Sequence, residues 1–242
     1  MTKPIYAIGD IHGHPDELDA ALARIERDGG PGAHIVFLGD YTDRGPDSRA
    51  VIDRLITGQA EGRNWTCLRG NHDRMMALFC GPYPQQDNQL LLGYHWLHPR
   101  IGGVETLASY GVAVPDGIRT YQLHEQVRAA VPQAHLDFLA GLQNFHEAGD
   151  LLFVHAGIRP GVALQDQKED DLIWIRGAFL DDPRPHPWLV VHGHTHVPTP
   201  EHHGNRVNLD SGAGYGHPLT AAVFEKGEVS ILTDNGRERL TP

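Results

Sequence analysis

Short apolar segments, each followed by a glycine-containing polar loop and then by a helical pattern, recur in the first third of the chain. Residues 5–8, 34–38 and 65–68 are apolar and have the length of buried strands. Helical spacing of apolar residues follows each one, from Pro15 to the Gly29-Gly30 pair, around residues 51–56, and over residues 74–79. Three strand-loop-helix units in series predict an α/β layered core.

The middle of the chain, from Gly81 to Gly149, has a different pattern of helical pieces and loops. One helix ends at residues 106–111, and residues 135–142 form another with leucines on one face. We expect a helical cover, at about residues 81–149, over one rim of a site. None of the histidines in this segment stands beside a carboxylate in a glycine-rich loop, so we expect surface positions for His95, His98, His124, His135 and His146.

Strand and helix patterns return after Gly149. The pattern predicts a strand over residues 151–154, a helix over residues 170–179 and, after three prolines, a strand over residues 188–191. Apolar and polar residues then alternate around a Lys226-Gly227 turn, which predicts an antiparallel second sheet made of residues 207–210, 219–224 and 229–232. No repeat, linker or low-complexity tract interrupts the chain, so we expect residues 1–242 to form one domain.

The composition is that of a globular protein. Hydrophobic residues make up 40% of the chain, enough to bury a core, and the longest apolar runs are too short to cross a bilayer, so we expect no membrane association. The first predicted strand begins within a few residues of Met1, so we expect no signal peptide. Two cysteines, Cys67 and Cys80, cannot build a disulfide framework, and we expect reduced thiols and a cytoplasmic location.

The formal net charge of −11 bears on the partners of the protein. Long polyanions such as DNA normally require a basic surface, so we expect no nucleic-acid partner. Part of the acidity belongs to residues that are candidates for binding metal ions, which are described next.

Polar residues stand directly after the predicted strands, at the edge of an α/β sheet where ligands gather. Glycines in these loops let the backbone approach an ion or a phosphate closely. The run from His192 to His196 follows one such strand, and imidazole is a common ligand of divalent metals. Mixed imidazole and carboxylate ligands suit Mn, Fe or Zn. Their number exceeds the need of one ion and predicts a two-metal site from Asp10, His12, Asp40, Asn71, His155, His194 and His196.

The candidate ligands fall in short segments that have a definite order and spacing along the chain. The motifs are Gly9-Asp10-Ile11-His12-Gly13, Gly39-Asp40-Tyr41-Thr42-Asp43-Arg44-Gly45, Gly70-Asn71-His72-Asp73, an isolated His155 and Gly193-His194-Thr195. Together they resemble the signature of the phosphoprotein phosphatase family of calcineurin-like metallophosphoesterases. The resemblance covers nearly the whole chain and implies a four-layer α/β/β/α sandwich.

The resemblance also implies a role for each motif residue. Asp10, His12 and Asp40 would hold the first of two divalent ions, and Asp40 would bridge to a second ion held also by Asn71, His155 and His194. The ions, with Mn favoured over Fe or Zn, would supply a hydroxide for in-line attack on phosphorus. The remaining roles would be those of a general acid, of the residue that orients it and of two phosphate-binding arginines: His72, Asp43, Arg44 and Arg176.

Three positions depart from the pattern of the family. Asp73 stands where the family usually has Glu, and Thr42 stands where it usually has Val; we expect neither change to touch a ligand. His196 is a second histidine that protein phosphatases of this family often lack and that other calcineurin-like esterases place on the first metal. His196 therefore supports the description as a metallophosphoesterase better than the description as a protein phosphatase. We expect His192 to point away from the ions.

The resemblance implies a metal-dependent phosphomonoesterase, most similar to small bacterial Ser/Thr protein phosphatases, with phosphotyrosine as a further substrate. Its partner would be a phosphorylated protein or a small phosphoester. One alternative is a symmetrical diadenosine tetraphosphate hydrolase, or another nucleotide or small-molecule phosphatase. Another is a non-catalytic module that binds metal or phosphate. His72 and Asp43, which the metals do not need, argue against that module. The oligomeric state stays open.

Overall fold

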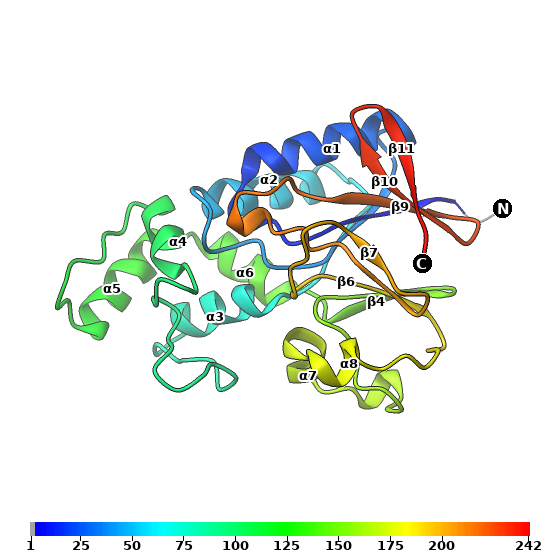
Figure 1. Cartoon of the computed structure of the whole chain (residues 1–242). Coiled ribbons are helices and arrows are strands. Elements are labelled where there is room, and N and C mark those ends of the chain that lie inside the picture. The colour runs from blue at the N-terminus through cyan, green and yellow to red at the C-terminus, as the bar shows by residue number, and fades with distance from the viewer. Residues whose placement is uncertain (1–2) are drawn as a thin grey trace.

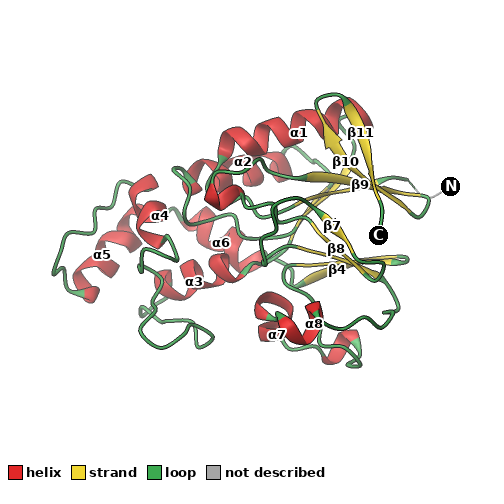
Figure 2. Cartoon of the chain, in the orientation of Figure 1, coloured by secondary structure: helices red, strands yellow, loops and turns green. Residues whose placement is uncertain are grey.

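The computed structural model describes residues 3–242 and contains two β-sheets packed face to face, with helices on their outer sides (Figures 1 and 2). In spatial order, the six strands of the first sheet are β11 (Gly236–Leu240), β10 (Glu228–Thr233), β9 (Ala221–Glu225), β1 (Ile5–Ile8), β2 (His34–Phe37) and β3 (Trp65–Cys67). The five strands of the second sheet are β4 (Phe145–Ala148), β5 (Leu151–Val154), β6 (Leu189–His192), β8 (Arg206–Asn208) and β7 (Glu201–His202).

The helices divide between the two outer sides. On the side of the first sheet, and extending beyond its end, lie α1 (Pro15–Gly29), α2 (Ser48–Ala60), α3 (Asn71–Cys80), α4 (Gly103–Ser109), α5 (Thr120–Ala130) and α6 (Gln133–Gly141). Below the second sheet lie α7 (Glu169–Trp174) and α8 (Gly177–Leu180) (Figure 1). None of the helices within residues 3–242 combines the length and the apolar character that a membrane span requires.

Three apolar cores hold these layers together. Strand alternation explains them: in β1, Tyr6 and Ile8 point into the core under the helices, whereas Ala7 points into the core between the sheets. The core between the sheets also contains Phe153 of the second sheet. On the other side of that sheet, Leu152 packs in a third core with α7 and α8. The expected α/β sandwich is therefore confirmed.

Strands β1, β2 and β3 are parallel to one another, and so are β5, β6 and β8. The carboxyl ends within each group therefore lie at the same edge of its sheet. In open α/β sheets this edge is where ligands bind, because the loops that leave the strands there can converge. Every polar motif of the sequence begins at one of these strand ends.

The prediction that the last strands form an antiparallel second sheet is wrong. Strands β9 and β10 join the first sheet, where β9 runs antiparallel to β1 with Ile5 opposite Phe224. Strand β8 lies in the second sheet but is parallel to β6, with Val191 opposite Val207. Alternation of apolar residues indicates which face of a strand is buried, but not which strand it pairs with. The turn at Lys226-Gly227 is confirmed, with φ values of 54° and 77° that suit a tight hairpin.

Two further expectations differ from the structure. The helix expected over residues 170–179 is broken, because Arg176 has φ −133° and ψ −111° between α7 and α8. Of the histidines expected at the surface, two are buried. His124 contacts the Gly81 carbonyl oxygen at 2.9 Å, and the two ring nitrogens of His135 contact Tyr110 and Asp53. A hydrogen-bonded histidine can be buried at low cost, which residue type alone does not reveal.

Candidate active site

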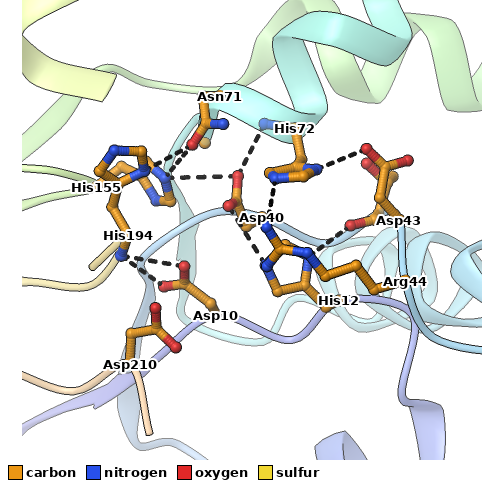
Figure 3. Close-up of polar contacts among 12 residues, drawn as sticks. Asp10, His12, Asp40, Asp43, Arg44, Asn71, His72, His155, His194 and Asp210 are labelled. Atoms are coloured by element: carbon orange, nitrogen blue, oxygen red, sulfur yellow. Dashed lines mark hydrogen bonds and ion pairs between the residues drawn. The ribbon is translucent and has the colours of Figure 1, made fainter. Parts of the chain in front are cut away.

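The carboxyl ends of six parallel strands carry polar side chains to one place (Figure 3). The side chains come from Asp10 after β1, Asp40 after β2, Asn71 after β3, His155 after β5, His194 after β6 and Asp210 after β8. All six residues are less than a tenth exposed. In Figure 3, Asp40 lies in the middle, with one group of side chains on either side of it. We call these six residues, together with His12, the Asp40 cluster.

On one side of Asp40, two imidazoles and an amide face each other. Asn71 Oδ1 lies 2.9 Å from His155 Nε2 and 2.8 Å from His194 Nδ1. His155 Nε2 also lies 3.5 Å from Asp40 Oδ1. Four possible ligand atoms from four strand ends therefore surround one position, and the carboxylate and two imidazoles alone form a group that could hold a metal ion.

On the other side of Asp40, His12 and His72 complete a second group that could hold a metal ion. His12 Nε2 lies 3.5 Å from Asp40 Oδ2. Asp10 lies between the two sides, where its carboxylate accepts hydrogen bonds from the His194 backbone N–H at 3.0 and 3.3 Å. Asp40 is thus shared by both groups.

Backbone carbonyls set the orientation of two of the imidazoles. His12 Nδ1 contacts the carbonyl oxygen of Thr42 at 2.8 Å, and His155 Nδ1 contacts that of Leu38 at 2.9 Å. A carbonyl oxygen can only accept, so each Nδ1 carries the proton. The lone pair of Nε2 then points into the Asp40 cluster in both residues, as a metal ligand requires.

The backbone of the site is strained. Six non-glycine residues within residues 3–242 have a positive φ, and five of them belong to the site: His12 (48°), Asp40 (53°), Asp43 (74°), Arg44 (68°) and His194 (66°). Such a conformation is uncommon for residues with a Cβ and persists only where the surroundings hold it. Its concentration here indicates that the loops are shaped for the direction of these side chains rather than for their own stability.

Two glycines leave room for the carboxylates of the cluster. A Cβ atom at Gly193 would collide with Asp10 Oδ1, and a Cβ at Gly70 would collide with Asp40 Oδ1. The glycines of these motifs are therefore needed for the close approach of backbone to ligand.

Asp73 has a larger part in the site than its sequence position suggests. Its carboxylate accepts hydrogen bonds from the backbone N–H groups of Asp40, Tyr41 and Gly70 at 2.8 to 2.9 Å. We expected Asp73 to contact no candidate metal ligand. This is wrong for Asp40, because the backbone N–H of Asp40 donates to the Asp73 carboxylate, although the Asp40 side chain does not contact it.

His72 and Asp43 form a buried pair, with His72 Nδ1 2.7 Å from Asp43 Oδ2. Two residues of the helical segment support the Asp43 carboxylate. Trp96 Nε1 donates to both of its oxygens at 3.0 Å, and Thr106 Oγ1 donates to Oδ1 at 2.8 Å. The sequence analysis missed both residues. No local signal marks them, because each is more than 50 residues from Asp43 and belongs to no motif.

The two candidate phosphate-binding arginines lie at the mouth of the Asp40 cluster. Arg44 donates from Nη1 to His12 Nε2 at 2.6 Å and from Nη2 to His72 Nε2 at 3.1 Å, and its guanidinium lies 4.8 Å from the centre of the Tyr215 ring. Arg176 is exposed and donates to Thr195 Oγ1 at 2.9 Å, directly after His194. The two contacts use one N–H group of each terminal nitrogen of Arg44, and its Nε has no hydrogen-bond partner among residues 3–242.

Two of the histidines in the run 192–196 lie outside the Asp40 cluster. His196 is exposed, and its ring lies 4.8 Å from that of Tyr215. His192 is buried edge to face against Phe179 at 5.2 Å and has Nε2 3.4 Å from Arg206. Of the seven candidate ligands, the structure thus brings six together and leaves His196 apart.

Burial is the main cause of the pKa shifts in the cluster. It raises the pKa of Asp10 and Asp40, and the neighbouring Asp210 carboxyl raises both further. Burial lowers the pKa of His12, and it lowers that of His155 to about 4. Neutral imidazoles are the form that binds metal, and buried carboxylates need a cation to stay ionised.

The donor set fits divalent cations. Carboxylate, amide and neutral imidazole groups converge in a buried space, and Asp40 lies between two groups of ligands. His194 Nε2 is buried without a hydrogen-bond partner among residues 3–242. The polar contact of this ring is made by Nδ1, which faces Asn71 Oδ1. The geometry matches a centre in which Asp40 is shared by two ions.

Comparisons with known proteins agree with this chemistry. Residues 3–232 match the family model described as calcineurin-like phosphoesterase. The chain is 28% identical over 244 residues to the asymmetrical bis(5′-nucleosyl)-tetraphosphatase PrpE of Bacillus subtilis, with 91% of each protein covered. All of its residues superpose on a protein assigned as a diadenosine tetraphosphatase (20% identity, TM-score 0.64, 95% of that chain) and on a cold-active protein-tyrosine phosphatase of a psychrophilic Shewanella (18% identity, TM-score 0.60, 81% of that chain). At these identities the superpositions show a shared fold.

Proposed function

Because the chain belongs to the calcineurin-like phosphoesterase family, we propose that it is a metal-dependent hydrolase of dinucleoside tetraphosphates. The observation that carries the proposal is the similarity to a bis(5′-nucleosyl)-tetraphosphatase over 91% of both chains. The substrate preference expected from the sequence, a phosphoprotein, becomes the alternative.

The family uses two divalent ions, and the Asp40 cluster has the ligands for both. Asp10, His12 and Asp40 would hold one ion, with His72 of the second group kept for the leaving group because Asp43 binds its Nδ1. Asn71, His155 and His194 would share Asp40 to hold the other ion. When bound, the two ions lower the pKa of a water molecule and so supply a nucleophile at neutral pH. The mixed oxygen and nitrogen donors suit Mn, with Fe or Zn as alternatives. His196 would bind an ion only after a shift of its loop.

The arginines would bind the phosphate that reacts. A guanidinium presents two parallel N–H groups to two phosphate oxygens, which fixes the orientation of the phosphate and neutralises the charge that develops on it. Arg44 reaches the site from the loop after β2, and Arg176 reaches it from the break between α7 and α8. The two arginines would therefore approach the phosphate from different sides, Arg44 from the first sheet and Arg176 from the helices that cover the second sheet.

His72 would protonate the leaving group through Nε2. Asp43 accepts the hydrogen bond from Nδ1 and so keeps Nε2 directed toward the reaction, while Trp96 and Thr106 fix Asp43. Nε2 now accepts a hydrogen bond from Arg44 and carries no proton; the transfer of Arg44 to a phosphate would free Nε2 to take up from water the proton that it then gives to the leaving group.

The His72–Asp43 pair is also what favours the alternative, a protein phosphatase. A leaving phosphate group is stable as an anion, whereas a serine or threonine alkoxide must be protonated as it leaves. A dedicated acid is therefore more important for phosphomonoesters than for phosphoanhydrides. The buried and well-supported position of His72 keeps a phosphothreonine substrate as the second candidate.

The test is to incubate the protein reconstituted with Mn²⁺ with diadenosine tetraphosphate and to separate the nucleotides formed. We expect ATP and AMP if cleavage is asymmetrical and two molecules of ADP if it is symmetrical. Release of phosphate from a phosphothreonine peptide with no nucleotide product would contradict the proposal and support the alternative. Parallel samples with Fe²⁺ and Zn²⁺ identify the metal that supports turnover.

A nucleotide substrate and the two unpaired, buried cysteines are consistent with the proposed cytoplasmic location.

A further inference from the structure

A cavity of about 610 Å³ adjoins the Asp40 cluster on the side of α7 and α8. Arg176 lines this cavity and also donates to Thr195, next to His194. Trp174 lines it as well, and its ring stands edge to face against the His194 ring at 5.8 Å. Arg176 and Trp174 therefore lie in the wall between the cavity and the Asp40 cluster.

We propose that this cavity, the Arg176 cavity, binds one nucleoside end of the dinucleotide substrate. The proposal rests on the proposed function and assigns the part of the chain that selects the substrate. Pockets for ligands of this kind have volumes of roughly 300 to 1,000 Å³ and combine apolar walls with a few polar groups. The Arg176 cavity has such a volume, and its lining is more polar, with seven charged or amide side chains beside Val162, Trp174, Ile175 and Ala178.

Its walls offer the groups that a nucleoside and its first phosphate need. Trp174, Val162 and Ala178 provide apolar surface for a base, and Asp166 provides a carboxylate that can accept hydrogen bonds from ribose hydroxyls. Lys168 lies at the same wall and adds a positive charge for a phosphate.

The other acidic residues of the cavity are already paired with arginines. Asp170 Oδ1 lies 2.6 Å from Arg74 Nη1, and Asp171 accepts a two-pronged hydrogen bond from Arg159 at 2.5 and 2.9 Å. Their charge is therefore largely compensated. Arg74 also links α3, which begins at Asn71, to this wall, so the cavity is held at a set distance from the Asp40 cluster.

Two other large hollows are described among residues 3–242, and neither shares a lining residue with the Arg176 cavity. A cleft of about 1,290 Å³ is lined by Ile5, His34 and Leu151, the first residues of β1, β2 and β5. It is separated from the site by the length of the strands, roughly 13 Å for four residues. A hollow of about 530 Å³ is formed by α5 and Tyr83 and shares no lining residue with the Arg176 cavity. Among these three hollows within residues 3–242, the Arg176 cavity is the one whose lining residues, Arg176 and Trp174, contact Thr195 and His194.

The experiment fills the cavity without touching the catalytic groups. Ala178 and Val162 are exposed in its wall, so Ala178→Trp and Val162→Trp are two independent ways to occlude it. Ala129→Trp is the matched control, because it adds the same side chain to an exposed helix position in the separate hollow on α5. Each protein is assayed with diadenosine tetraphosphate and with p-nitrophenyl phosphate, which is small enough to need only the Asp40 cluster.

We expect both filled variants to raise KM for the dinucleotide by about tenfold or more, with kcat/KM for p-nitrophenyl phosphate unchanged and Ala129→Trp like the wild type. Unchanged KM for the dinucleotide in both filled variants would overturn the assignment of the cavity and leave the proposed function standing. Equal losses on both substrates would also overturn it. A wild-type protein that does not cleave the dinucleotide would overturn the proposed function, and this proposal with it.

Discussion

The Asp40 cluster and the Arg176 cavity lie side by side but are built in different ways. The cluster is buried, its residues stand at strand ends, and backbone carbonyls and amides hold them. The cavity is formed by two short helices and the loops around them, and Arg176 is exposed at a break between these helices. The difference indicates that the chemistry depends on the backbone of the fold, whereas the choice of substrate depends on side chains that can change without disturbing it.

The largest effect expected within the cluster follows from His72→Asn. This change removes the proposed acid but none of the proposed metal ligands, so kcat for a phosphothreonine peptide should fall by about 10² to 10⁴-fold with metal content retained. The loss with diadenosine tetraphosphate should be smaller, because its leaving group needs less protonation. Turnover and metal analysis on one preparation check both statements, and unchanged turnover of the peptide would remove His72 from the mechanism.

Gly193→Ala tests whether the cluster depends on the close approach of the backbone. The added methyl group collides with Asp10 Oδ1, and displacement of this carboxylate should weaken metal binding by about 10 to 100-fold. A metal titration followed by activity measures it. Gly141→Ala is the control, because a Cβ there meets no atom within 4 Å and its φ is not positive. Equal affinity in both variants would show that the cluster tolerates a shift of Asp10.

A smaller effect is expected from Trp96→Phe, which removes the indole donor to Asp43 but keeps an aromatic ring. A hydrogen bond to a charged group contributes about 1.5 kcal/mol or more, so kcat should fall by about tenfold with KM little changed. The pH profile of kcat should shift as well, because Asp43 acts on the protonation of His72. Trp65→Phe, at a half-buried site on β3, is the matched control. A loss of stability with normal kcat would make Trp96 a purely structural residue.

Far from both regions, Asp28→Asn should change stability without changing activity. Two hydrogen bonds from Arg237 lower the pKa of Asp28, and its side chain is about one-fifth exposed. A lowered pKa stabilises the fold above the unfolded value of about 4, and the contribution is lost as the pH falls through the folded value. Chemical unfolding should show a loss of about 1 kcal/mol at pH 7 that shrinks below about pH 4. Glu228→Gln, in a more exposed pair with Arg239, should show almost none.

The same comparison explains which features the sequence predicts. The strand ends and their polar motifs are local, so the α/β sandwich and six converging ligands follow from patterns of a few residues. The left-handed backbone of Asp40 and His194 is not visible in such patterns, because it results from contacts made after folding. It decides, however, where the side chains point.

Features that depend on distant segments could not be predicted. The supports of Asp43 come from Trp96 and Thr106, and hydrophobic alternation did not reveal that β9 pairs with β1. The break at Arg176, which creates the Arg176 cavity, lies in a stretch with a continuous helical pattern. The Arg176 cavity, which we propose selects the substrate, is thus the part of the molecule about which the sequence says least. The expectation of a protein phosphatase came from the motifs of the cluster alone.

The central claim is that the Asp40 cluster hydrolyses phosphate bonds and that the Arg176 cavity makes a dinucleotide a better substrate than a phosphoprotein. The most direct measurement is a competition: one sample of the Mn²⁺-reconstituted protein acts on an equimolar mixture of diadenosine tetraphosphate and a phosphothreonine peptide, and the initial rates of loss of both are recorded. Their ratio is the ratio of the two kcat/KM values. The account predicts faster loss of the dinucleotide. Faster loss of the peptide would contradict it.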